Sequence, residues 1–316
     1  MQSKIQLLLL KGLQDKDIEK QVITPSVIRL SNKKQNNFKE HGDLIKIKGF
    51  ITDFSNIDKL EKLNLTIWFG DYNYIIPFSF LLKYNNNSLI NKLKINSNDG
   101  YFIEFPHDIL LKHKIPLISL TYWPFTISIE ELDENIIVDM VLDTYILDVD
   151  ARKEAAITDK MYNIKSIQEF KIQSAGNSIN ELYKFYEYSS DIRPELLTQG
   201  IIINYPKNQI HKLLIIFNNT IKCLDYDDKL INIYGEDIGE NLTYFGFNIE
   251  ENFISNNQIG CINMSIIDKV NVNVEIKILR TDEEIIPVDN EQYVKMYTIS
   301  SNIINYKMGF CGRLYA

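Results

Sequence analysis

In the middle of the chain, strand-forming residues give way to helix-forming residues and then return within a short stretch. This succession constrains the fold more than any other feature. Val138–Leu147 alternates and is rich in β-branched and aromatic residues, which is typical of a strand. Asp148 and Asp150 follow, and either carboxylate can accept hydrogen bonds from the first turn of a helix. Good helix formers come next. The segment therefore predicts a strand, an acidic cap and a short helix over Ala151–Ile157, before a strand resumes near Ile167.

Short β-type runs separated by turn residues fill the chain on both sides of this joint. Their lengths favour an antiparallel sandwich or barrel, and the lack of βαβ units and of a Gly-rich phosphate loop excludes most nucleotide-binding folds. In the first half the predicted strands are Val22–Leu30, Leu44–Phe54, Leu63–Phe69, Tyr101–Phe105, Pro116–Tyr122 and Phe125–Leu132. In the second half they are Gln168–Ser174, Gly200–Tyr205, Lys212–Asn218, Leu242–Asn248, Gly260–Ile267, Val270–Leu279, Tyr293–Ser300 and Lys307–Leu314.

Four segments refine this pattern. Lys212–Asn218 contains the run LLIIF and is predicted as a strand that is buried on both faces. Val270–Leu279 alternates between apolar and polar residues, which predicts one buried face. Asn85–Asn98 is rich in asparagine and is predicted as a loop, and Asn219–Asn241 as a polar, acidic connection with one short strand. No long helical periodicity appears before the joint.

Composition removes several classes of function. A formal net charge of −8 argues against a protein that binds nucleic acid over much of its surface. Three cysteines without CxxC spacing indicate reduced thiols rather than disulfides or a zinc site. No apolar run approaches the roughly 20 residues that a membrane span needs. Leu7–Leu10 is too short for a signal peptide, so none is expected.

No group of residues has the spacing of a catalytic or metal site. His107, Asp108 and His113 are close in sequence, but they stand among lysines and no second cluster supplies further ligands, so loop histidines are the simpler interpretation. His41 and His211 are isolated. No G-x-S-x-G motif occurs, and no Cys has a His nearby in sequence. We therefore expect no catalytic residue, no cofactor and no metal site.

One aromatic run beside acidic residues is compatible with sugar binding. Tyr122–Phe125 contains three aromatic side chains, and Glu130 and Glu131 follow closely. Sugar sites combine exposed rings with carboxylates, and a glycosidase needs two carboxylates opposed across a cleft. Packing in a core or an interface explains the rings more simply, and the acids suit the end of a strand in water.

The first 20 residues are predicted to be an amphipathic arm. Ile5 and four leucines precede a charged run that ends at Lys20. The first 50 residues carry ten Lys or Arg and five Asp or Glu, a net charge of +5, so residues 51–316 carry −13. A surface with uneven charge is the plainer interpretation. The other is an arm that binds an acidic surface or a membrane headgroup layer.

Seven short motifs follow one another along almost the whole chain. In this order they resemble the major capsid protein family of nucleocytoplasmic large DNA viruses, the double jelly-roll family. Ile267 stands where that family has Arg, and the chain is short for the family, so the resemblance is to a short member or a paralogue. The motifs are KGLQD with IT at residues 11–15 and 23–24, NF at 37–38, GDLI at 42–45, IPLISL at 115–120, LDVDARK at 147–153, GCINMSIID at 260–268 and NYKMGFCGRLY at 305–315.

The resemblance implies an all-β protein with two consecutive eight-stranded jelly rolls, a double jelly roll, joined by a short linking helix. On that basis residues 1–20 form the N-terminal arm, 21–150 the first jelly roll, 151–166 the linking helix and 167–316 the second jelly roll. Two domains of this size, an arm and a joint account for the length of the chain.

The resemblance also implies a structural role. Three copies of a two-barrel protein would form a homotrimer with a pseudo-hexagonal outline, and such capsomers would tile an icosahedral shell. The implied partners are further copies of the chain, minor capsid proteins and an internal membrane contacted by the arm, without sequence-specific nucleic-acid binding. The implied location is the virion, with assembly in the host cytoplasm.

Two alternatives stay open at this point. A capsid-derived scaffold or minor shell protein would share the fold but not the role. A carbohydrate-binding β-sandwich would share the jelly roll, because lectins use the same architecture.

Overall fold

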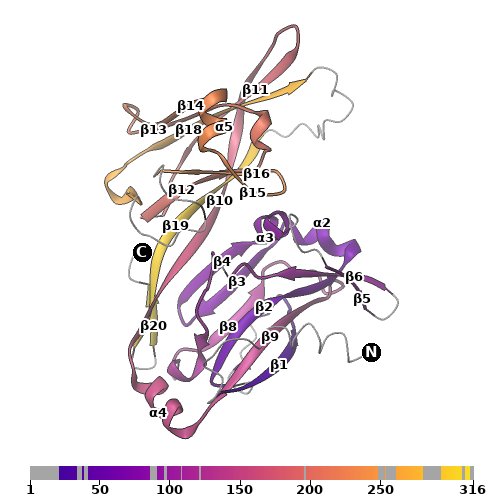
Figure 1. Ribbon diagram of the computed structural model, residues 1–316, viewed down its shortest axis with the longest axis vertical. Helices are drawn as coiled ribbons and strands as arrows, with labels where there is room; N and C mark the ends of the chain where they lie inside the picture. The colour runs from indigo at the N-terminus through magenta and orange to yellow at the C-terminus, as the bar shows by residue number, and fades with distance from the viewer. Residues whose placement is uncertain are drawn as a thin grey trace.

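The protein is described by a computed structural model in which two β-rich blocks follow one another along the long axis (Figure 1). The described residues are 21–33, 38, 42–85, 91–95, 98–107, 109–120, 122–195, 197–247, 253, 261–279, 293–307 and 310–313. The arm over residues 1–20 therefore lies outside them.

The first block is built from two antiparallel sheets. A six-stranded sheet has the order β1-β9-β2-β6-β5, with β7 paired to β2, and a three-stranded sheet has the order β4-β3-β8. Phe50, Phe69 and Phe125 are among the rings buried between these sheets. The strands are β1 (Gln21–Arg29), β2 (Leu44–Asp53), β3 (Asn64–Phe69), β4 (Tyr72–Pro77), β5 (Asn91–Ile95), β6 (Asn98–Glu104), β7 (Ile115–Pro116), β8 (Phe125–Ile129) and β9 (Val138–Leu147).

Short helices close this block. The apolar helix α3 (Phe78–Asn85) directly follows β4, and Phe78, Phe80 and Leu81 on it are completely buried. The other helices are η3 (Phe54–Asn56), α2 (Ile57–Leu60) and η4 (Leu117–Ser119). A sharp turn before β4 depends on Gly70, which has a φ of +64° and on which a Cβ would lie 2.2 Å from the Trp123 ring.

The joint has the predicted order of strand, acidic cap and helix. Helix α4 (Val149–Ile157) begins at Asp148, whose carboxylate accepts a hydrogen bond from the Ala151 N–H at 2.7 Å. The Arg152 guanidinium then pairs with Asp43 of the first block at 3.0 Å. The linking helix predicted over residues 151–166 is too long, because residues 160–166 already belong to the next strand.

The second block is a single curled sheet of eleven strands, ordered β14-β13-β18-β11-β10-β19-β12-β16-β15, with β17 paired to β12 and β20 to β19. The sheet curls round a second apolar core, and α5 packs beside β13 and β14. Its elements are β10 (Lys160–Ile179), β11 (Tyr183–Ile192), β12 (Leu197–Ile203), η5 (Lys207–Gln209), β13 (Ile210–Phe217), β14 (Ile221–Asp227), α5 (Asp228–Tyr234), β15 (Glu236–Gly239), β16 (Leu242–Gly246), β17 (Ile262–Asn263), η6 (Met264–Ile266), β18 (Val270–Leu279), β19 (Tyr293–Lys307) and β20 (Phe310–Arg313).

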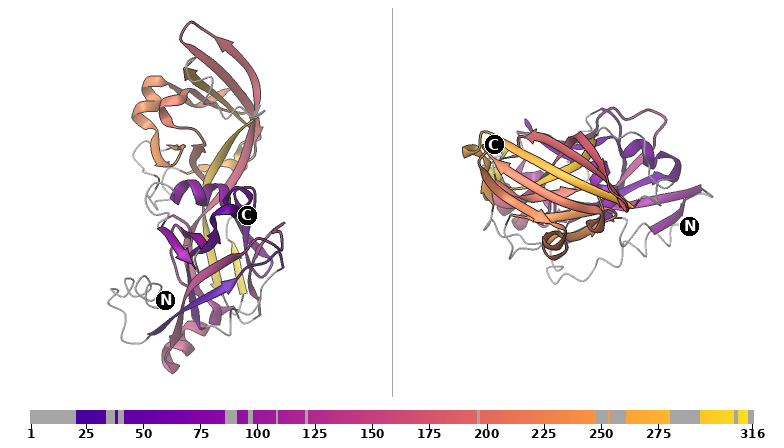
Figure 2. Two further views of the ribbon diagram at one scale, coloured as in Figure 1. Left: turned by 90° about the vertical axis from the view of Figure 1, so that its right-hand side faces the viewer. Right: turned by 90° about the horizontal axis from the view of Figure 1, so that it is seen from above.

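Two strands run along both blocks. β10 and β19 pair without a break from Lys160 opposite Tyr306 to Gln173 opposite Tyr293. In Figure 1 they descend from the second block past the first, and Figure 2 shows the yellow strands β19 and β20 among the indigo and purple elements of the first block. Together with β12 and β16 they form a four-stranded part of the sheet that we call the wall.

The wall has one apolar core on each face. On β19, Met296 belongs to the second core and Tyr297 to the first. On β12, Ile201 and Ile203 belong to the second core, while Ile202 between them belongs to the first. Successive side chains of a strand point to opposite faces of the sheet, so this alternation is what places a core on either side.

Several sequence predictions are confirmed by the strands. Val270–Leu279 is a strand with the predicted bounds, and its apolar residues from Val270 to Ile276 are buried in alternation. Lys212–Asn218 does lie on a strand, but only one face is buried, because Leu214 and Ile216 are half-exposed.

Other predictions about local structure are wrong. The expected loop Asn85–Asn98 contains β5, because an edge strand needs only backbone pairing with β6 and tolerates polar side chains. Asn219–Asn241 contains two strands and a helix rather than one strand. In Pro116–Tyr122 and Gly260–Ile267 only two-residue strands form, at Ile115–Pro116 and Ile262–Asn263, and a 3₁₀ turn follows each.

Among the described residues, no helix combines the length and the apolar character that crossing a membrane requires.

The cap of α4 makes a testable prediction. Asp148→Ala removes the acceptor for the Ala151 N–H and should lower the free energy of unfolding by about 0.5–2 kcal/mol. Urea denaturation followed by circular dichroism measures this change. Asp150→Ala is the matched control, since this neighbouring carboxylate lies in the first turn without acting as the cap, and it should have a smaller effect. Equal losses in the two variants would contradict the assignment of the cap.

Candidate functional site

Polar side chains connect the two blocks where they meet, and we call this contact the seam. It lies where β4 and α3 of the first block meet the wall. At its centre the Tyr297 hydroxyl donates a hydrogen bond to Ser79 Oγ at 2.9 Å, and Ser79 donates to Glu169 at 2.8 Å. Burial raises the pKa of Tyr297 far above its ordinary value, so this hydroxyl remains a donor.

Two further hydrogen bonds extend the seam along α3. The Lys83 ammonium lies 3.1 Å from the Asn204 side-chain oxygen and 3.3 Å from the Glu61 carboxylate. The Lys83 carbonyl accepts a hydrogen bond from the Glu240 N–H at 2.9 Å. A Cβ on the neighbouring Gly239 would lie 2.6 Å from that carbonyl, so a side chain there would push the blocks apart.

On the other side of β4, Arg313 of β20 makes further contacts of the seam. The Arg313 guanidinium on β20 pairs with Glu195 at 3.1 Å and lies over the Tyr72 ring, 5.2 Å from its centroid. Ser166 donates a hydrogen bond to the same Glu195 carboxylate. A cavity of about 370 Å³ opens beside these residues, between β4 and β10. Of its charged side chains, Glu195 and Arg313 pair with each other, and Glu169 accepts a hydrogen bond from Ser79 and lies 3.9 Å from Lys295. Each of these charges therefore already has a partner within the protein.

His113, a candidate from the sequence, is part of the seam and not of a metal site. Its ring stacks on Tyr162 of β10 with a centroid distance of 4.0 Å and a tilt of 7°, and its Nε2 lies 3.1 Å from the Tyr306 hydroxyl. Its Nδ1 is buried without a hydrogen-bond partner in the described part of the chain. Burial lowers the pKa of His113 to about 4, so the ring is neutral at pH 7.

His107 contacts other groups than His113 does. His107 contacts the carbonyl oxygens of Ile47 and Leu111, and burial lowers its pKa to about 4 although both carbonyls favour the charged ring. Asp108 and His41 lie outside the described residues. Among the residues that are described, no group of three or more His, Cys, Asp or Glu could hold a metal ion.

The aromatic run and the acids of the suggested sugar site are not brought together. Trp123 and the exposed Tyr122 contact the Phe310 ring of β20, at centroid distances of 5.6 and 5.3 Å. Glu130 and Glu131 follow the far end of β8, which separates them from the rings by its whole length. A strand rises about 3.3 Å per residue, so the rings and the carboxylates cannot bind the same sugar ring.

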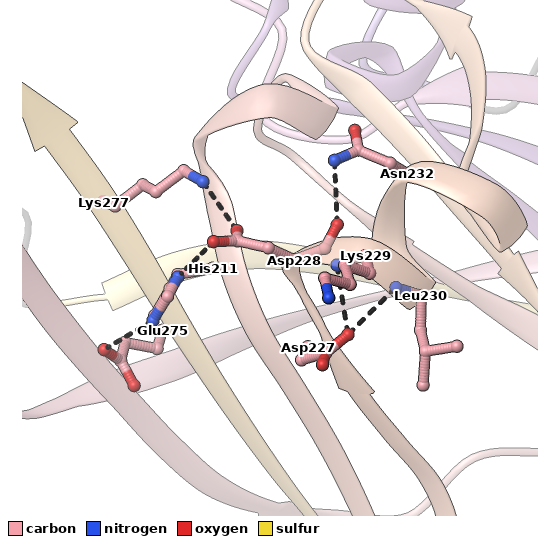
Figure 3. Close-up of polar contacts among 8 residues, drawn as sticks. All are labelled: His211, Asp227, Asp228, Lys229, Leu230, Asn232, Glu275 and Lys277. Atoms are coloured by element: carbon pink, nitrogen blue, oxygen red, sulfur yellow. Dashed lines mark hydrogen bonds and ion pairs between the residues drawn. The ribbon is translucent and has the colours of Figure 1, made fainter.

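A second polar cluster lies on the second block, around the start of α5 (Figure 3). His211 of β13 places its Nδ1 2.9 Å from Asp228, and Lys277 of β18 contacts the other oxygen of that carboxylate at 2.6 Å. Burial alone would raise the pKa of Asp228, but the hydrogen bonds from Lys277 and His211 outweigh it and lower the pKa. His211 Nε2 also lies 4.0 Å from Glu275.

The contacts of this second cluster hold the start of α5 against β13 and β18. The Asp227 carboxylate caps α5 by accepting hydrogen bonds from the Lys229 and Leu230 N–H groups, at 3.0 Å each. Asp228 has both oxygens engaged, and the groups around it include no Ser or Cys nucleophile. Sequence reasoning treated His211 as isolated because its partners are 17 and 64 positions away along the chain.

No protein-family profile matches the sequence, and no curated protein matches it. Solved structures do match. VP54 of PBCV-1, from a crystal structure fitted into a cryo-EM reconstruction of the virophage Sputnik, superposes with a TM-score of 0.67 at 12% identity. The match covers 96% of this chain and 100% of that one. A chain from a quasi-atomic model of the PBCV-1 virus capsid superposes with a TM-score of 0.65 at 11% identity, over 96% of this chain and 100% of its own.

The chain has the double jelly-roll fold. The fold class inferred from the order of the sequence motifs is therefore confirmed over nearly the whole length of the protein. An identity of 12% shows a shared fold and not a shared role. This chain differs from two separate eight-stranded jelly rolls in two respects. In the described residues its blocks have nine and eleven strands, and the wall contributes to both cores.

His113 makes the seam sensitive to acid. Its pKa is about 4 in the folded protein and 6.5 ordinarily, so the unfolded chain binds this proton more readily, and stability falls as the pH drops from about 6.5 towards 4. For this residue the loss is about 2 kcal/mol at pH 5 relative to pH 7. His113→Phe keeps a ring on Tyr162 and removes the titration.

Urea denaturation at pH 5 and pH 7 measures this effect. The difference in unfolding free energy between the two pH values should shrink in His113→Phe, although His107 still contributes. Lys112→Gln, at an exposed neighbouring position, is the control and should keep the wild-type difference. An unchanged pH dependence in His113→Phe would show that His113 does not titrate as described.

Proposed function

We propose that this chain is a structural protein of a viral capsid, which forms homotrimers of pseudo-hexagonal outline that tile an icosahedral shell. The observation that carries the proposal is the match in fold to VP54 of PBCV-1, which covers all of that chain and 96% of this one. A match over one jelly roll would say little, because lectins use that architecture too. A match over both jelly rolls and their junction narrows the candidate functions to those of proteins built from two joined jelly rolls.

The shape of the protomer supports the trimer. Two similar barrels joined into one block give a protomer with twofold pseudo-repetition, and three such protomers round an axis present six barrels. Such a unit packs against identical units on all sides, as a closed shell requires.

The absence of catalysis is the second part of the proposal. In the described residues, the two polar arrangements, at the seam and at the start of α5, engage their charged groups in contacts within the chain. Such groups hold elements together, and neither arrangement combines a nucleophile with an adjacent base. We infer that the protein acts through its surfaces and needs no cofactor or metal.

Location and partners follow from the same proposal. The protein is a component of the virion, assembled in the host cytoplasm, where its partners are further copies of itself and minor capsid proteins. It does not read nucleic-acid sequence. The alternative within the same fold is a capsid-derived scaffold or minor shell protein, which would associate with a shell or its precursor without tiling it.

The oligomeric state is the first prediction from this proposal. Multi-angle light scattering of the purified protein should give three times the chain mass of 36.9 kDa, in low and in high salt. Salt resistance is expected because lasting interfaces bury more than about 2,000 Å², largely apolar. Electron microscopy should then show flat arrays or shells, whereas a scaffold relative would show neither.

A monomer at micromolar concentration in both salts would contradict the trimer. A glycan array separates the remaining alternative, since specific binding that is lost in Tyr122→Ala would favour a carbohydrate-binding protein. Tyr122 is 69% exposed and contacts the exposed Phe310 ring, so this substitution removes no side chain from either core.

The arm is the second prediction. We propose that Met1–Lys20 faces the inside of the shell and contacts an internal membrane or minor capsid proteins. Each lysine near an anionic surface contributes about 1 kcal/mol, and Lys4, Lys11, Lys16 and Lys20 are partly offset by three acids. The leucines must therefore supply much of the binding, at about 1.5–3 kcal/mol for each fully buried side chain.

Deletion of residues 1–20 should leave the trimer and its melting temperature unchanged but abolish flotation with phosphatidylserine vesicles. A full-length variant with serine at Leu7, Leu8, Leu9 and Leu10 keeps the charges and should lose most of the same binding. If deletion instead lowers the melting temperature by many degrees and dissolves the trimer, the leucines belong to the core and the arm is not a docking element.

A further inference from the structure

The wall belongs to the second block, but it supplies side chains to the cores of both barrels. β12 lies in the middle of the wall, and Ile201, Ile202 and Ile203 on it are at most 1% exposed. The first and third of these side chains enter the second core, and the middle one enters the first. An ordinary two-domain protein has solvent or a polar interface between its cores. Here a single layer of β-sheet separates them.

The first core is incomplete without strands that come late in the chain. Phe69 of β3 meets the Tyr306 ring edge-on at 6.2 Å, and Phe80 of α3 meets Tyr297 edge-on at 5.7 Å. Tyr306, Tyr297 and Cys311 are all at most 1% exposed within this core. Without β19 and β20 the first barrel would lose these side chains and expose the apolar surface that they cover.

Buried hydrogen bonds cross the same boundary. The Tyr74 hydroxyl of β4 donates to the Lys165 carbonyl of β10, and the Tyr297 hydroxyl of β19 donates to Ser79 of α3. Separation of the barrels while both stay folded would break these bonds and uncover the apolar face of the wall.

We propose that the two barrels fold and unfold as one cooperative unit, so that the protomer is a single rigid block. Because β19 and β20 lie far downstream of the strands of the first block, the first barrel closes only after both of them have been synthesised. If the protein tiles a shell, which rests on the proposed function, the curvature of that shell comes from contacts between chains and not from bending between the barrels.

The two tryptophans allow a test in the intact chain. Trp68 and Trp123 both lie in the first block, and Trp123 also contacts Phe310 of β20, so tryptophan fluorescence follows the first barrel and its contact with that strand. Leu213 of β13 is completely buried in the second core, and its strand pairs only with β14 and β18, away from the wall. Leu213→Ala should lower the fluorescence melting temperature by about 3–7 °C and the circular-dichroism melting temperature equally.

The matched control is Leu214→Ala, the same substitution one residue along the strand, where the side chain is half-exposed on the opposite face. It should move both transitions much less. If Leu213→Ala fails to fold, Ile215→Val in the same core is the milder variant, with a smaller but still coincident shift.

Independent barrels would give a different result. Leu213→Ala would then leave the fluorescence transition in place while a separate, earlier transition appeared by circular dichroism. That outcome overturns the proposal. The test follows unfolding within one chain and needs no shell, so a protein that proved monomeric, against the proposed function, would still answer it.

Discussion

The structure depends on the register of two long strands. β10 and β19 pair over fourteen consecutive positions without a bulge, and this pairing decides which side chains face which core. A slip by one residue would exchange the faces, sending Tyr297 into the second core and Met296 into the first. Both barrels would then lose their packing together. Register is therefore the constraint from which the seam, the wall and the relative position of the barrels follow.

Sequence reasoning succeeded where one face of a strand is exposed to solvent. Val270–Leu279 alternates cleanly because polar residues mark its outer face, and the structure has the strand with the same bounds. The capped start of α4 was predicted equally well, with Asp148 and Asp150 as the two alternatives, and the structure selects Asp148. Both signals are local, so one sequence contains all the information that they need.

Sequence patterns failed to predict burial where it depends on parts of the chain that are distant in sequence. LLIIF in β13 and the isoleucines of β12 look alike in sequence, yet only β12 is buried on both faces, because the first block covers one of them. The apolar helix α3 has no amphipathic period to reveal it, since Phe78 and Phe80 are buried among neighbours from both blocks. The partners of His113 and His211 are likewise remote along the chain and could not be paired from spacing.

Apolar burial and polar contacts have different effects at the seam. Apolar contacts across the wall supply affinity between the blocks but little direction, because the hydrophobic effect is not directional. Hydrogen bonds are directional, and those of Tyr74, Ser79 and Lys83 each connect one defined atom of the first block to one of the second. Three such bonds, spread along β4 and α3, determine both the tilt and the sliding position of one barrel on the other. Because its barrels are held together at several separated points, the protomer keeps the same shape in every contact that it makes.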